Sequence, residues 1–353
     1  MKLLSEIDVS QKRVFLRADL DVPIEEFAVD PSKTRLASGG SSQFTEATRL
    51  QNLRPTVDYL FENGADKVII GGHLDRTKGF DPALSTKQLL EPLERILGQE
   101  IVFSSQLKSS VNREPTTDNH IVLLENLRFW PGEVKNDQTF AQQLAKLADV
   151  YINEAFGNCH RSHSSMVALP ALLPHAAGLH LEKEIEELTG ILKDPKKPFV
   201  AIVGGAKIET KLPLVENLAK IADLVLVGGE LPIEIRQKNM KLKENVLVAQ
   251  LTEDGKDINQ ESIDAFIQKI KTAQTIVWNG PLGLFEEGYK KGTIEIAQAI
   301  LKSPAYEIIG GGETVQFLIE HQLLSKFSFV SSGGGAMLEF LSGEKLPGIK
   351  ALE

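Results

Sequence analysis

Apolar and polar positions alternate in two rhythms along the first half of the chain. Runs rich in valine, isoleucine and leucine, typical of buried strands, lie at residues 12–19, 66–73, 120–126 and 149–155. Longer stretches with apolar side chains three and four positions apart, typical of helices, lie at residues 49–64, 85–98 and 139–148. Strands that alternate with helices pair in parallel, so this half predicts an α/β fold with a doubly wound parallel sheet.

The rhythm breaks at residues 177–193, a charged amphipathic stretch that stops shortly before Pro195. Proline cannot continue a helix, so we expect a helix here that links two lobes. Further strand candidates lie at residues 199–205, 223–229, 244–249, 275–280, 306–312 and 327–335. The second half therefore predicts a second α/β lobe.

Composition narrows the class of protein. The chain has 353 residues, enough for two domains with separate cores, and 42% of them are hydrophobic and 25% charged. No apolar run approaches the ~18 residues of a membrane helix. The net charge of -9 argues against nucleic acid as a partner. The single cysteine, Cys159, fits a reducing compartment, so we expect a cytoplasmic protein.

The ends of the predicted strands carry the candidate chemistry. Most strand candidates of the second half end in glycine, which lets backbone N–H groups approach phosphate oxygens beyond the carboxyl ends of a parallel sheet. We expect a nucleotide there. In the first half, cationic or titratable side chains follow strand ends or begin a helix, and they predict a pocket for a small anion. They are Arg17, Arg49, His73, Arg76, Arg128, His160 and Arg161.

The lysines after the strand candidate at residues 199–205 leave two interpretations open. Lys207 follows two glycines and one alanine, and Lys211 comes four residues later, at the start of a predicted helix. The spacing G-x-x-x-x-G-K-[ST] of the NTPase phosphate loop is absent. By itself the segment fits either a phosphate site or a strand-to-helix turn with two solvated lysines.

Nine segments, in this order along the chain, resemble phosphoglycerate kinase. They lie at residues 17–23, 47–50, 71–79, 123–137, 149–165, 199–211, 277–286, 308–315 and 331–348. ENLRFWPGE and VWNGPLGLFE among them are far more specific than a glycine pair. The resemblance implies two Rossmann-like doubly wound parallel-sheet domains joined by a helix and hinge. An N-terminal domain would span residues 1–176, the helix and hinge 177–196, and a nucleotide-binding domain 197–342, with the tail at 343–353 packing back on the first domain.

The resemblance also implies a reaction. Phosphoglycerate kinases transfer phosphoryl reversibly between ATP and the carboxylate of 3-phosphoglycerate, with Mg²⁺, giving 1,3-bisphosphoglycerate and ADP. The implied partners are these small molecules, and the implied state is a monomer. Such a transfer depends on positioning and charge stabilisation more than on a protein nucleophile.

The family's functional residues map onto this chain by motif. The implied catalytic set is Arg49, Lys207, Lys211, Gly312 and Gly335, with Gly311 and Gly334 beside the two glycines. The implied set for the acid substrate is Arg17, Asp19, Asp21, Arg49, His73, Arg76, Arg128, His160 and Arg161. The implied nucleotide set is Gly205, Ala206, Lys207, Lys211, Gly229, Asn279, Pro281, Leu284, Glu286, Gly311, Gly312, Glu313 and Thr314. Glu313 would also contact the metal, because Mg²⁺ prefers oxygen ligands.

The chain departs from the family at positions near both sites. Asp21 stands where the family has asparagine, and Asp75 where it has glycine; two added charges should weaken anion binding. Glu230 replaces a glycine, and residues 255–260 read GKDINQ where the family reads GLDIGP. The segment between Gly229 and Trp278 is also several dozen residues shorter than we expect for the family. We therefore hypothesise loose base selectivity or weak ATP binding.

Other functions remain open at this point. A repurposed or catalytically weak relative with altered nucleotide or acid specificity would keep the fold. A dinucleotide-dependent oxidoreductase would need G-x-G-x-x-G after a strand, and no such run occurs. Cys159, His160 and His163 lie close enough in sequence for a metal or thiol site, but no second ligand pair appears elsewhere.

Overall fold

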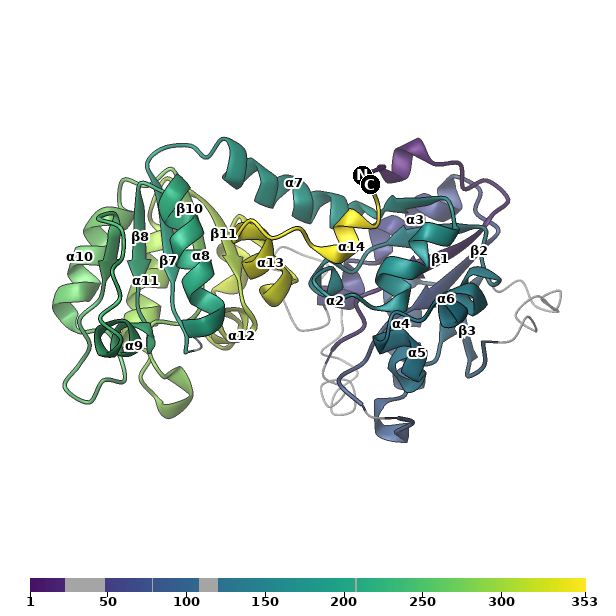
Figure 1. Cartoon of the computed structure of the whole chain (residues 1–353), viewed down its shortest axis with the longest axis horizontal. Coiled ribbons are helices and arrows are strands. Elements are labelled where there is room, and N and C mark those ends of the chain that lie inside the picture. The colour runs from purple at the N-terminus through teal and green to yellow at the C-terminus, as the bar shows by residue number, and fades with distance from the viewer. Residues whose placement is uncertain (23–47, 78, 108–119, 207) are drawn as a thin grey trace. The chain divides into compact units, whose positions relative to one another are not determined.

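The computed structural model describes residues 1–22, 48–77, 79–107, 120–206 and 208–353 (Figure 1). Lys207, one of the predicted catalytic residues, therefore lies outside the described residues. The chain forms two compact units. The first contains the described residues up to Ile185 together with Lys345–Glu353, and the second contains Glu186–Glu344.

The first unit is built on a parallel sheet of six strands. The strands are β1 (Arg13–Arg17), β2 (Lys67–Gly71), β3 (Ile101–Ser104), β4 (Ile121–Leu124), β5 (Val150–Asn153) and β6 (His175–Ala177). Their order in the sheet is β3-β4-β2-β1-β5-β6. In the register, Arg17 lies opposite both Gly71 and Asn153, so the carboxyl ends of the three central strands coincide.

Helices flank this sheet (Figure 1). They are α2 (Thr48–Gln51), α3 (Arg54–Glu62), α4 (Leu90–Leu97), α5 (Pro131–Val134), α6 (Gln138–Ala145) and α14 (Pro347–Lys350). Helix α4 shows the amphipathic pattern clearly, because Leu93, Ile96 and Leu97 are buried on one face. They join the core formed by the apolar side chains of β1 and β2.

The second unit repeats the architecture, which confirms the predicted pair of doubly wound parallel sheets. Its strands are β7 (Phe199–Val203), β8 (Leu224–Val227), β9 (Val246–Val248), β10 (Thr275–Asn279), β11 (Tyr306–Gly310) and β12 (Phe329–Val330). The order is β12-β11-β10-β7-β8-β9, the Rossmann order. The topological switch point therefore lies between β7 and β10, where open α/β sheets bind their ligands.

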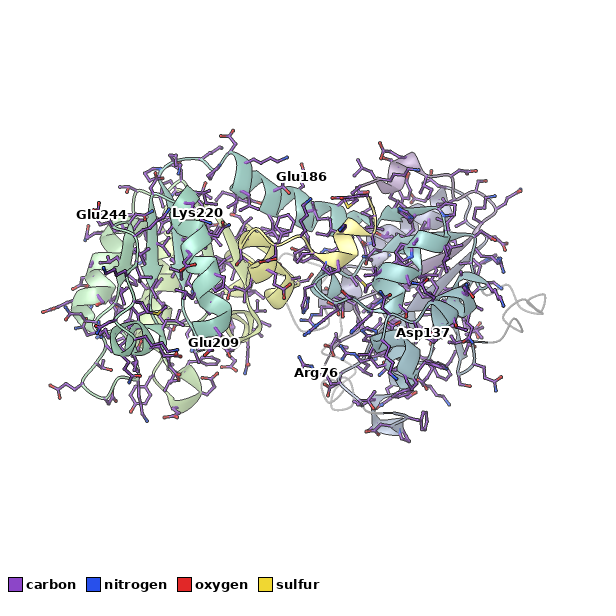
Figure 2. All side chains as sticks on the ribbon, in the orientation of Figure 1. Arg76, Asp137, Glu186, Glu209, Lys220 and Glu244 are labelled. Atoms are coloured by element: carbon purple, nitrogen blue, oxygen red, sulfur yellow. The ribbon has the colours of Figure 1, made fainter. Side chains whose placement is uncertain are left out.

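The helices of the second unit cover its sheet. They are α8 (Ile208–Ile221), α9 (Leu231–Gln237), α10 (Gln260–Ile270), α11 (Lys291–Leu301), α12 (Gly312–Glu320) and α13 (Gly334–Leu341). Helix α8 carries Glu209 in its first turn and Lys220 in its last (Figure 2). This charge order complements the helix dipole. Trp278, the fourth residue of β10, is fully buried and donates its indole N–H to the carbonyl of Gly280 at 2.8 Å.

One helix, α7 (Leu179–Lys193), contains the boundary between the units, and its residues fall in the stretch predicted to be the linking helix.

Single turns of 3-10 helix occur at Leu4–Glu6, Pro82–Leu84, Thr86–Leu89, Leu127–Phe129, Phe156–Asn158, Pro170–Leu172, Phe285–Glu287 and Leu324–Lys326, and a π-helical turn occurs at Ser164–Ala168. None of the helices in the described part of the chain is long and apolar enough to cross a membrane.

The C-terminal segment packs within the first unit. The N–H of Gly348 donates to the carbonyl of Cys159 at 2.8 Å. A Cβ at Gly348 would lie 2.9 Å from the Cα of Cys159 and 2.7 Å from the Cε of Met166. Any larger residue would have to push the tail away, so glycine is required for this close approach.

Candidate functional site

The predicted basic residues of the first unit gather at the carboxyl edge of its sheet. Arg17 ends β1, and Arg128 and Arg161 follow β4 and β5. Burial lowers the pKa of Arg128, and the charges of Arg17, Arg161 and Arg76 lower it further, although Asp21 opposes them. The guanidinium groups of Arg17, Arg161 and Arg76 are therefore close enough to repel that of Arg128. Such a cluster is stabilised by an anion with several oxygens.

Three aspartates contact two of the arginines at this edge. The Nε of Arg49 lies 3.8 Å from a carboxylate oxygen of Asp19, and its Nη1 donates to the carbonyl of Asp21 at 2.5 Å. Arg76, labelled in Figure 2, is exposed. Arg128 is half-buried and donates through Nη1 to the carbonyl of Asp75. The guanidinium groups of Arg49 and Arg128 are thus held at the strand ends, and Arg76 extends into solvent beside them.

The two departures, Asp21 and Asp75, touch each other. The N–H of Asp75 donates to Oδ1 of Asp21 at 2.8 Å, and Asp75 has a φ of 50°, in the left-handed region where the family's glycine is at ease. The Asp75 carboxylate accepts from the N–H of Arg76 at 2.6 Å. An amide oxygen could replace the Asp21 carboxylate in this contact, so its charge serves no evident structural need.

Arg17 lies beneath the other arginines and is 0% exposed. It donates through Nε to Oγ of Ser165 at 2.8 Å, through Nη1 to the carbonyl of Ala18, and through Nη2 to Nδ1 of His73 at 3.0 Å. Because the imidazole Nδ1 accepts this bond, its proton is on Nε2 in the neutral ring. The orientation of His73 is therefore set by Arg17.

Glu133 completes this buried network. Its Oε1 accepts from Nε2 of His73 at 2.6 Å and from Oγ of Ser165 at 2.5 Å, and its Oε2 accepts from the N–H of Ser165 at 3.0 Å. Burial alone would raise the pKa of Glu133, but these hydrogen bonds and the charge of Arg17 lower it to about 2. Burial and Arg17 lower the pKa of His73 to about 4. A carboxylate thus balances a buried guanidinium through a neutral imidazole and a hydroxyl. The sequence analysis identified neither Glu133 nor Ser165.

Two further histidines follow β5: His163 adjoins this network, and His160 is close to the charges of Arg161 and Arg76. The ring of His163 packs edge-on against His73, with centroids 4.9 Å apart, and its Nδ1 is buried without a hydrogen-bond partner among the described residues. Burial and the neighbouring charge lower the pKa of His160 to about 4 and that of His163 to about 3. Both rings are neutral at pH 7, so they offer hydrogen bonds to an anion more than charge.

The buried histidines and Glu133 are poorly suited to hold a metal ion. Ligand atoms of His73, Glu133 and His163 all lie within 4.8 Å of one another. The guanidinium of Arg17 donates to His73, however, and its positive charge disfavours a cation there. Cys159 lies outside this group, and burial raises the pKa of its thiol to about 12.

In the second unit, glycines let two backbone segments cross at the switch point. The N–H of Gly204 donates to the carbonyl of Asn279 at 2.9 Å, and the N–H of Gly205 donates to that of Pro281 at 2.8 Å. Gly280 has a φ of 96°, and a Cβ there would lie within 2.9 Å of Gly205 N. The loops after β7 and β10 can approach only because these positions lack side chains.

Lys211 projects from the first turn of α8 to this crossing. Its Nζ donates to Oδ1 of Asn279, which is 0% exposed. Burial lowers the pKa of Lys211 to about 8, although Glu313 opposes the shift. The Nδ2 of Asn279 has no partner among the described residues. A poorly solvated ammonium beside a free amide donor is suited to phosphate oxygens.

The N-termini of α12 and α13 meet near Lys211. A Cβ at Gly334 would lie 3.0 Å from the Cα of Gly311, whereas one at Gly312 would meet nothing within 4 Å. Gly335 is the second residue of α13. Thr314 accepts the N–H of Gly280 through Oγ1 at 2.7 Å, which ties α12 to the loop after β10. Free N–H groups at both helix starts form a site for anions.

A small pocket, which we call the base pocket, adjoins the crossing and has a volume of ≈ 70 Å³. Predicted nucleotide-binding residues that line it are Gly205, Ala206, Gly229, Pro281, Leu284, Glu286 and Glu313. Glu230 and Lys256 line it too. A Cβ added at Gly205 would lie 3.4 Å from a carboxylate oxygen of Glu313, and Glu286 is exposed. The second unit thus gathers an ammonium, helix N-termini and a pocket at one edge.

Comparison with protein-family models gives a match over most of the chain. The model described as phosphoglycerate kinase matches residues 4–245 and 231–344. Matches to curated relatives extend over the full length. Phosphoglycerate kinase of Leptospira biflexa is 35% identical over 404 positions, covering 100% of this chain and 98% of the relative.

Two further comparisons agree. The cytosolic phosphoglycerate kinase of Triticum aestivum is 35% identical over 99% of this chain and 97% of its own. The structure of phosphoglycerate kinase from Coxiella burnetii has a TM-score of 0.79 and 29% identity, covering 99% of this chain and 98% of its own. That from Pyrococcus horikoshii has a TM-score of 0.81 and 28% identity, covering 100% and 98%. The chain belongs to the phosphoglycerate kinase family, whose members transfer phosphoryl between ATP and the carboxylate of 3-phosphoglycerate.

Proposed function

We propose that the arginine edge of the first unit binds 3-phosphoglycerate and that the β7–β10 edge of the second unit binds the nucleotide. The observation that carries the proposal is the partly buried ammonium of Lys211, which donates to Asn279 at a topological switch point. An ammonium with a lowered pKa gains most from a phosphate, which restores the solvation that burial removed.

Within the first unit we assign the acid substrate to the residues above the buried network. Arg49, Arg76, Arg128 and Arg161 supply forked donors for a phosphate and a carboxylate. Arg17 is fully buried, so we do not assign it a direct contact with the acid substrate. Its role is to position His73 and to add positive charge beneath the site. His160 is neutral at pH 7 and would donate or accept one hydrogen bond.

Within the second unit, Lys207 and Lys211 are assigned to the phosphates. Gly311, Gly312 and Gly335 are assigned to the phosphate oxygens through backbone N–H groups. Glu313 is the residue that would hold Mg²⁺, since its carboxylate is exposed at the edge of the base pocket. When bound, the ion neutralises developing charge on the phosphates. We further propose that the protein is a cytoplasmic monomer.

A coupled assay with ATP, Mg²⁺ and 3-phosphoglycerate tests the assignment. We expect turnover by the parent protein and a loss of at least about 100-fold in kcat/KM for Arg49→Ala, because a charged donor at the transferred group is worth several kcal/mol. Arg54→Ala is the matched control, since this neighbouring arginine is exposed and pairs only at 3.4 Å with Asp58. Equal activities of the two variants would refute the role of Arg49.

Asp21→Asn tests whether the added charge weakens the acid site. The asparagine oxygen can still accept the N–H of Asp75, so the loop keeps its shape while one negative charge leaves the arginines. We expect the KM for 3-phosphoglycerate to fall severalfold, with the KM for ATP unchanged, as removal of a like charge near a surface anion site predicts. Steady-state kinetics at low ionic strength measure it. An unchanged KM for 3-phosphoglycerate would show that the charge is already neutralised.

A further inference from the structure

Two charged side chains of the base pocket have no role in the assignments above. Glu230 and Lys256 line the pocket, between the glycine and proline segments of the loops after β7 and β10. Glu230 directly precedes α9, and Lys256 lies in the turn before α10. They stand where the family sequence has glycine and leucine. At these two positions the family sequence gives the pocket a backbone wall and an apolar side chain, whereas this chain gives it two charges.

The backbone fixes both positions. The N–H of Glu230 donates to the carbonyl of Gly205 at 3.1 Å, beside the phosphate-binding turn. The carbonyl of Lys256 accepts the N–H of Leu284 at 2.9 Å. Both residues therefore lie on walls of the pocket that also contain the nucleotide-binding segments, and these bonds hold their backbones in place.

The ammonium of Lys256 is paired within the protein, whereas the carboxylate of Glu230 is not paired with any described residue. The Nζ of Lys256 lies 2.6 Å from Oε2 of Glu287 and 5.1 Å from the ring centre of Tyr289. An ammonium has three donors, so two remain for a ligand. Glu230 is half-buried, and within the described part of the chain no hydrogen bond or ion pair engages its carboxylate. A half-buried carboxylate without a partner gains from a ligand that donates two hydrogen bonds.

The two purines differ in what they offer to such a pair. Adenine presents one acceptor nitrogen, N1, next to its 6-amino donor. Guanine presents two adjacent donors, N1–H and the 2-amino group, next to the O6 acceptor. A carboxylate can accept both guanine donors side by side while an ammonium donates to O6. Against adenine, the second carboxylate oxygen faces the lone pair of N1.

We propose that the base pocket recognises guanine, through the carboxylate of Glu230 and the ammonium of Lys256, so that GTP serves this kinase at least as efficiently as ATP. The inference rests on the proposed nucleotide site in the second unit and names its base selectivity. It replaces the expectation of loose base selectivity with a specific one, because a carboxylate and an ammonium that match the hydrogen-bonding edge of guanine do not match that of adenine.

The experiment compares ATP and GTP, each with Mg²⁺ and 3-phosphoglycerate, in the same coupled assay. We expect kcat/KM for GTP to equal or exceed that for ATP. Absence of turnover with either nucleotide would refute the proposed function itself. Turnover with ATP and a preference of more than about 10-fold over GTP would refute only the guanine inference.

Three variants locate the selectivity. Glu230→Gly restores the family residue at a helix start, where glycine is tolerated, and should shift the GTP/ATP ratio of kcat/KM toward ATP by about 10-fold or more. Glu230→Gln keeps the shape and should shift it the same way. Lys256→Leu should shift it by a smaller factor. Binding of GDP and ADP, measured by calorimetry, should show the same shifts without turnover. An equal effect of Glu230→Gly on both nucleotides would overturn the inference.

Discussion

Replacing Lys211 with methionine should lower kcat by about 10²- to 10³-fold, as expected for the loss of one charged donor at a transferred phosphoryl group. Methionine keeps the length and apolar character of the lysine stem. The substitution therefore removes the ammonium that Asn279 holds and leaves α8 its packing. Steady-state assays with saturating ATP and 3-phosphoglycerate measure the loss.

The pH dependence gives this prediction a second readout. The pKa of Lys211 is lowered from 10.5 to about 8 by burial, so between these values the unfolded chain binds more protons than the folded one. The free energy of unfolding should therefore rise as pH increases from about 8 to 10.5. Nucleotide affinity should fall over the same range, because the phosphates require the ammonium. Both trends should be absent from Lys211→Met.

Lys220→Met is the matched control. Lys220 lies in the last turn of the same helix, is exposed, and approaches Asn217 at only 3.5 Å. We expect its kcat and both pH trends to match those of the parent protein. If Lys211→Met retained the parent kcat, the assignment of Lys211 to the phosphates would be wrong.

The central strands could be predicted from sequence because each is a run of buried apolar residues. Runs such as Val68–Ile70 are buried on both faces, as parallel strands between helix layers must be. The edge strands β3 and β6 were not predicted. Only the first residue of β3 is buried, and β6 has three residues, so neither gives the apolar run on which the prediction depends.

The arginine edge could be predicted for a topological reason. Parallel strands bring their carboxyl ends together, so residues after each strand end are neighbours although they are far apart in sequence. The burial of Arg17 could not be predicted, since arginine is rarely buried and nothing in its local sequence marks it. Its partners His73 and Ser165, and Glu133 which bonds to both of them, come from three distant segments and meet only in the fold.

Glu133→Gln should destabilise the protein by about 3 kcal/mol and lower kcat/KM for 3-phosphoglycerate at least about 10-fold. Removing one partner of a buried charge network leaves the other charge, here Arg17, uncompensated. Glutamine has one acceptor oxygen where glutamate has two. If that oxygen keeps the bond from His73, its amide N–H₂ faces the N–H of Ser165, so at least one bond at 3.0 Å or less is lost.

The dependence of the free energy of unfolding on pH in the acid range should change as well. The pKa of Glu133 is lowered to about 2 in the folded protein from a usual 4.5. Its contribution is therefore present above pH 4.5 and is lost as pH falls through 2. The parent protein should lose stability across this window, and Glu133→Gln should lose less. Chemical denaturation at a series of pH values measures both curves.

A control for general destabilisation lies at the other end of β1, the strand that ends in Arg17. Arg13, at the start of β1, pairs with Asp149 at 2.7 Å, remote from the carboxyl edge. Asp149→Asn should reduce stability by at most about 1 kcal/mol, because both groups are partly exposed, and should leave kcat/KM unchanged. Ser165→Ala, which removes the hydroxyl shared by Arg17 and Glu133, should lower kcat/KM with a smaller loss of stability. If kcat/KM instead followed stability equally in all three variants, Glu133 would be a structural residue without a specific effect on the acid site.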